Sequence, residues 1–98
     1  MIVVIAVFQA RAGKEQELED KLKAVVPRVQ QEAGTLVYVL HRSSQGAGKF
    51  LFYEKYRDMD ALALHGASPY LAELIGAVGP LVEGEPSIEL YEELAAKN

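Results

Sequence analysis

The chain has 98 residues and a mass of 10.7 kDa; half of its residues are apolar and 24% are charged. This composition predicts one folded domain over residues 1–98 and excludes a disordered chain or a second core. Ten basic against fourteen acidic residues give a net charge of −4, which argues against nucleic acid as a partner, and the lack of cysteine excludes disulfides and Cys-based metal sites.

The N-terminal segment carries no recognisable targeting signal. Residues 1–8 lack the basic region and the cleavage site of a signal peptide. No apolar run approaches the roughly 18 residues that a membrane helix needs. We therefore expect a cytoplasmic protein with no membrane partner, and the absence of cysteine agrees with a reducing environment.

The first elements are predicted by a change in apolar periodicity. Residues 1–8 form a continuous, β-branched run that indicates a strand buried on both faces. An apolar stripe then marks one face of a helix: Leu18, Leu22, Val25, Val26 and Val29. Pro27 is expected to kink or break this helix, and Gly34 to end it with a positive φ. The acidic cluster at residues 15–20 is predicted to lie on a solvated face.

The next two segments predict a β-hairpin. Residues 35–42 and 49–56 are rich in aromatic and β-branched side chains, and the turn-forming segment 43–48 lies between them. Its glycines, followed by Lys49, resemble part of a phosphate-binding loop. Turn geometry explains them better, because the loop joins two strands and precedes no helix.

The remainder of the chain predicts two helices and a last strand. Asp58 is expected to cap a short helix that runs to about His65. Ser68 and Pro69 are expected to open another helix as its cap and first residue. That helix presents a regular apolar stripe: Leu71, Leu74, Ile75 and Val78. Gly79-Pro80 should end it, and residues 87–92 should form the fourth strand.

The resulting order β-α-β-β-α-α-β predicts an α+β, ferredoxin-like fold with a four-stranded antiparallel sheet. Its helices cover one face of the sheet, yet the first three strands are apolar on both faces. The uncovered face therefore predicts a homodimer that packs sheet against sheet. An irregular loop over this face is the alternative.

Two histidines are the natural titrating groups near neutral pH. His41 ends the second strand and is expected at the rim, whereas His65 lies at the edge of the short helix and could be a general base or a turn cap. Phe52, Glu54 and Tyr56 share one face of the third strand. Glu54 and Tyr56 would converge with His65 and Tyr70 if this face lies under the helices. The opposite parity would place Glu54 against a partner subunit.

Residues 54–71 resemble the antibiotic biosynthesis monooxygenase family. The matching features are Glu54-x-Tyr56, Ala61 four residues before His65, and Ser68-Pro69-Tyr70-Leu71. The segment 32–38 (Glu-Ala-Gly-Thr-Leu-Val-Tyr) is similar to the family's entry to its second strand. The resemblance covers nearly the whole chain and implies the dimeric α/β-barrel fold, with a cavity between the sheet and the helices of each subunit.

This resemblance also implies a function: oxidation of phenolic or quinol molecules by O₂ without a cofactor or a metal. It would make His65 the catalytic base or a hydrogen-bond partner of the substrate oxygen, and Glu54 the group that orients it. The substrate-binding residues would be Tyr56, Tyr70, Phe52, Leu62 and Tyr38.

Other functions remain open on the sequence alone. The haem-degrading pattern fails, because Ala6, Tyr56 and Ile75 stand where those relatives place Asn, Trp and a ligand His. An isomerase or tautomerase could use the same base to move a proton without O₂. A non-catalytic dimer that binds a small molecule is the third alternative.

Overall fold

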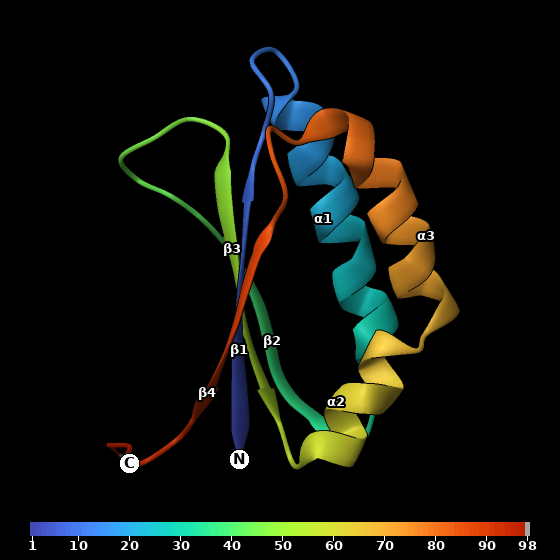
Figure 1. The fold of residues 1–98 in the computed structure, drawn as a ribbon, viewed down its shortest axis with the longest axis vertical. Helices are drawn as coiled ribbons and strands as arrows, with labels where there is room; N and C mark the ends of the chain where they lie inside the picture. The colour runs from blue at the N-terminus through green and yellow to red at the C-terminus, as the bar shows by residue number, and fades with distance from the viewer. Residues whose placement is uncertain (98) are drawn as a thin grey trace.

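A computed structural model describes residues 1–97 and shows a single sheet with all of its helices on one side (Figure 1). The elements follow the predicted order: β1 (Ile2–Gln9), α1 (Glu15–Val29), β2 (Thr35–Arg42), β3 (Lys49–Tyr56), α2 (Met59–Gly66), α3 (Pro69–Val78), the 3₁₀ turn η1 (Gly79–Leu81) and β4 (Ser87–Glu92). The four strands lie in the order β2-β3-β1-β4, and every neighbouring pair is antiparallel. The predicted α+β, ferredoxin-like fold is thus confirmed.

The main core lies between α1, α3 and the face of the sheet that we call the inner face. On β3 this face carries Phe50, Phe52, Glu54 and Tyr56, all of them buried. The apolar stripe of α1 packs against it, and Leu18 and Leu22 have no exposed surface. The parity that the sequence left open is therefore settled: Glu54 points under the helices.

The opposite, outer face of the sheet is also largely apolar. The register pairs Val39 with Tyr53, His41 with Leu51, and Ile5 with Tyr53. Val39 is 43% exposed, and within residues 1–97 no helix packs on this side (Figure 1). The feature that predicted a partner subunit is thus present in the fold.

Helix α1 differs from its prediction at two places. Pro27 does not break it, because the helix runs on to Val29 and the Val29 side chain is anchored in the core. Glu19 is not solvated as predicted: its carboxylate is buried and accepts hydrogen bonds from Lys23 and Arg42 at 2.8 and 2.6 Å. These two partners lower the pKa of Glu19 to about 2.

Gly34 serves a different purpose from the predicted helix stop. Helix α1 ends at Val29, and positive φ angles in residues 1–97 belong to Gly13, Gly48 and Gly84. A Cβ atom at Gly34 would lie 2.5 Å from Cβ of Ala61 in α2. The glycine therefore permits close approach of α2 to the start of β2, and this approach positions the site described below.

The two helices after β3 begin as the sequence indicates, with one difference. Asp58 caps α2 by accepting a 2.9 Å hydrogen bond from the Ala61 N–H. Pro69 opens α3, but the Ser68 side chain does not cap it and instead donates to the carbonyl of His65 at 2.7 Å. This bond ties the end of α2 to the start of α3.

In residues 1–97 no single helix combines the length and hydropathy required to cross a bilayer. Helix α2 and the segment Pro69–Leu81 satisfy those criteria only as a pair, and that pair is bent by 58°.

Candidate functional site

A cavity of about 510 Å³ lies between the inner face of the sheet and the helices. Its volume falls within the range of about 300–1,000 Å³ that is typical of small-molecule sites. Most of its lining is apolar, and its polar side chains are those of Tyr38, Glu54, His65 and Glu85. The complete lining consists of Val4, Ala6, Phe8, Tyr38, Phe52, Glu54, Leu62, His65, Gly66, Leu71, Leu74, Ile75, Val78, Gly79, Val82, Glu85, Pro86 and Ile88. Such a lining suits a largely apolar ligand that is oriented by a few polar contacts.

His65 is the group in this cavity best placed to handle a proton. It lies near the end of α2 and is only 4% exposed. Its Nδ1 atom lies 3.0 and 3.1 Å from the two carboxylate oxygens of Glu32. No hydrogen bond within residues 1–97 involves its Nε2 atom, so this nitrogen is the one available to a molecule in the cavity.

Glu32 fixes the imidazole and is itself held by two hydroxyl groups. Thr35 Oγ1 donates to Glu32 Oε1 at 2.6 Å, and the Tyr70 hydroxyl donates to Oε2. A carboxylate can only accept, so the hydrogen bond to His65 places the imidazole hydrogen on Nδ1. In the neutral ring Nε2 then carries the lone pair, which is the state that a general base needs.

Glu54 is the second polar group at the closed end of the cavity. The Tyr56 hydroxyl donates to Glu54 Oε1 at 2.6 Å, and both residues are buried. Burial raises the pKa of the Glu54 carboxyl, although the Tyr56 hydrogen bond and nearby His65 oppose that rise. Among the described residues, the carboxylate that hydrogen-bonds His65 is that of Glu32, and the orienting role that the resemblance implied for Glu54 stays a prediction.

The ring of Tyr38 packs between His65 and the apolar wall of the cavity. Its ring centroid lies 4.8 Å from that of Phe52 and 5.3 Å from that of His65. Burial, followed by the charges of Glu54 and Glu32, raises the pKa of the Tyr38 hydroxyl above its ordinary value. Tyr38 therefore stays protonated at neutral pH. In this state its hydroxyl can donate a hydrogen bond but cannot act as a base.

The structure brings together most of the residues that the sequence singled out. Of the residues predicted from the sequence, those that line the cavity are Tyr38, Phe52, Glu54, Leu62 and His65. Tyr56 and Tyr70 are not part of this lining, and their hydroxyl groups donate hydrogen bonds to Glu54 and Glu32 respectively. The sequence did not single out Glu32 as a candidate site residue. It also did not indicate that α3 and β4 contribute a wall of the cavity. The signal for Glu32 was its place in the Glu-Ala-Gly-Thr segment, two residues before a close-packed glycine.

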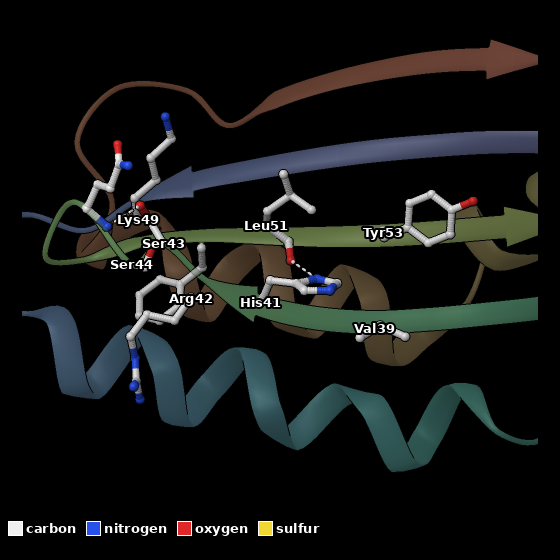
Figure 2. Close-up of a pocket in the computed structure, with 10 residues that line it drawn as sticks. Val39, His41, Arg42, Ser43, Ser44, Lys49, Leu51 and Tyr53 are labelled. Carbon is white, nitrogen blue, oxygen red and sulfur yellow. Dashed lines mark hydrogen bonds between the residues drawn. The ribbon is translucent and has the colours of Figure 1, made fainter.

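A second hollow, of about 670 Å³, opens on the outer face of the sheet and does not share this chemistry. Figure 2 shows Val39, His41, Leu51 and Tyr53 along β2 and β3 beside the hairpin turn. His41 Nδ1 lies 3.4 Å from the Leu51 carbonyl, and its side chain is exposed. The two histidines thus lie on opposite faces of the sheet, and only His65 has a carboxylate partner among residues 1–97.

The acidic and histidine side chains are too dispersed to form a metal site in residues 1–97. In the described part of the chain, no three His, Cys, Asp or Glu residues form a group that could hold a metal ion. That the reaction needs neither metal nor cofactor stays a prediction.

Comparison with known proteins gives a consistent result. The family model described as "Antibiotic biosynthesis monooxygenase" matches residues 1–77. The chain is 32% identical over 81 residues to "Putative monooxygenase Rv0793" of Mycobacterium tuberculosis, an alignment that covers 83% of this chain and 79% of that protein.

Solved structures agree with the sequence comparison. One from Deinococcus radiodurans, titled "putative antibiotic biosynthesis monooxygenase", superposes with a TM-score of 0.91 and 27% identity over 100% of this chain and 97% of that one. Another with the same description, from Caulobacter crescentus, gives a TM-score of 0.89 and 34% identity over 96% and 90% of the two chains.

Proposed function

The chain belongs to the antibiotic biosynthesis monooxygenase family, and on this basis we propose that it is a cofactor-independent monooxygenase of a phenolic or quinol small molecule. The observation that carries this proposal is the setting of His65. Its ring is buried at the closed end of an apolar cavity, its Nδ1 is held by Glu32, and its Nε2 faces a position that a substrate hydroxyl could occupy.

The first step is removal of a proton from the substrate. His65 Nε2 takes the hydroxyl proton, and the adjacent Glu32 carboxylate stabilises the imidazolium that forms. The resulting phenolate is electron-rich and can pass an electron to O₂, with which the neutral closed-shell molecule reacts slowly. The apolar walls keep bulk water away from this anion.

The overall reaction balances without an external reductant. The ring loses two hydrogens and gains one oxygen atom from O₂, and the second oxygen atom leaves as water. All four electrons needed to reduce O₂ come from the substrate: two accompany the loss of its two hydrogens, and two come from the carbon that forms the new carbon–oxygen bond. Glu54 and Tyr38 would hold the substrate oxygen atoms through hydrogen bonds.

Oxygen consumption tests this proposal directly. We expect the purified, chelator-treated protein to accelerate O₂ uptake by 1,4-naphthohydroquinone above the rate with heat-unfolded protein. With ¹⁸O₂, one labelled oxygen should enter the product, without release of hydrogen peroxide. Absence of uptake combined with anaerobic proton exchange into a dicarbonyl would identify a tautomerase. Absence of both, together with retained binding, would identify a binding protein.

We also propose a homodimer formed through the outer face of the sheet. An apolar sheet face of this extent is unusual on a monomer, and a twofold copy of the same face is its simplest cover. The apolar and aromatic side chains available to this interface are Ile5, Val7, Val37, Val39, Leu51, Tyr53 and Tyr91. Because the cavity lies on the inner face, each subunit would contain its own complete site.

The dimer predicts a specific change in molecular mass. Light scattering at micromolar concentration should report twice the 10.7 kDa of one chain for the wild type. Val39→Lys should yield the monomer, because a charge in the middle of β2 on this face would be buried against the second subunit without a partner. Leu64→Lys is the matched control, since Leu64 is 73% exposed on α2. A monomeric wild type would contradict the proposal. The cytoplasmic location inferred from the sequence stays a prediction.

A further inference from the structure

The charges around the cavity are all of one sign. Among the described residues that line it, none is Lys or Arg, and the carboxylates are those of Glu54 and Glu85. A bound anion would therefore leave water without gaining a cationic partner, which is a costly transfer.

The exposure of the lining residues shows which end of the cavity is closed and which end is open to solvent. Phe52, Glu54 and His65 are at most 5% exposed and form the closed end. Ile75 and Ile88 are each 62% exposed, and Glu85 is exposed beside them, so these three residues mark the mouth. A ligand must pass an acidic mouth to reach a closed end that holds a second carboxyl group.

A protonated His65 does not supply the cationic partner that a bound anion would need. Its Nδ1 faces the Glu32 carboxylate at 3.0 Å, so the positive charge of an imidazolium is already paired. The ring therefore offers an anionic substituent no free cation. It keeps one nitrogen for a hydroxyl group, as the proposed function requires.

We propose that the cavity accepts uncharged aromatic hydroxy compounds and rejects the same ring systems when they carry a carboxylate or phosphate. This inference rests on the proposed function and narrows its substrate class. The apolar wall accommodates the ring, the closed end contacts its hydroxyl group, and the lack of a cationic side chain among the lining residues sets the discrimination.

A matched pair of stable phenols tests the discrimination by binding alone. The probes are 6-hydroxy-2-naphthamide and 6-hydroxy-2-naphthoate, titrated into the wild-type protein by calorimetry at pH 7. The amide should bind at least about tenfold more tightly, because the carboxylate must be desolvated beside other acids. Equal affinities, or tighter binding of the carboxylate, would overturn this inference and leave the proposed function standing. If neither probe binds, both fail.

A charge reversal at the mouth provides a second measurement. Glu85→Lys should narrow the preference for the amide to about threefold or less, because the ammonium group can pair with the carboxylate of the probe. Glu83→Lys makes the same change in net charge two residues away, at an exposed position that does not line the cavity, and it should leave the preference unchanged. Equal narrowing by both variants would show that net charge, and not the mouth, sets the preference, and would overturn the inference.

Discussion

Replacing His65 with alanine should lower kcat/KM for the proposed oxygenation by about 10²–10⁴-fold, the usual contribution of a positioned general base. Among the described residues that line the cavity, His65 is the one whose free nitrogen can take the hydroxyl proton while its other nitrogen is held by a carboxylate. Without it the neutral phenol must ionise unaided in an apolar site. The O₂ uptake assay, run at a fixed pH on both proteins, measures the loss.

Two controls separate chemistry from folding in the His65 variant. His41→Ala removes the exposed histidine on the outer face and should leave the rate within about twofold, as expected for a surface change far from the site. Circular dichroism should show that His65→Ala still folds, because Glu32 keeps the hydroxyl donors of Thr35 and Tyr70. A folded His65→Ala protein that retained full activity would rule out the proposed base.

Leu22→Ala should reduce the free energy of unfolding by about 2–5 kcal/mol, the range for a large-to-small change in a packed core. Leu22 lies in the middle of α1, has no exposed surface, and packs in the cluster that contains Phe52 and Leu74. Truncation leaves a void between α1 and the sheet that this short chain can fill only in part. Urea denaturation at one protein concentration measures the change.

The matched control for this substitution is Leu64→Ala. Leu64 also lies in a helix, but it is 73% exposed, so its truncation should change the free energy of unfolding by less than about 0.5 kcal/mol. Similar losses in the two variants would contradict the placement of the core between α1 and the inner face of the sheet.

The order of the elements could be predicted because each has a local signal. The stripe on α1, the turn glycines before Lys49, and Pro69 at the start of α3 all depend on near neighbours in the sequence. The orientation of β3 could not be predicted in this way, since both of its faces carry aromatic side chains. Only the packing of α1 against Phe52 decides which face is covered.

The pairing of Glu32 with His65 was also hard to predict, because it too depends on tertiary packing and not on near neighbours in the sequence. Glu32 and His65 are 33 positions apart, and apart from its place in the Glu-Ala-Gly-Thr segment no local feature distinguishes Glu32 from a surface acid beside a turn. Glu19 was misplaced likewise, because its partner Arg42 comes from the end of β2. Pairings of this kind depend on tertiary approach, which periodicity does not encode.

Because Gly34 lies so close to Ala61, the side chain at one of these two positions limits the side chain that the other can carry. With 2.5 Å between the Ala61 methyl and a hypothetical Cβ on residue 34, this seam has room for only one methyl group. A sequence that gains a side chain at position 34 must therefore give one up at position 61, or let α2 swing outward and separate His65 from Glu32. Covariation between these two sites across relatives would be the evolutionary signature of that shared space.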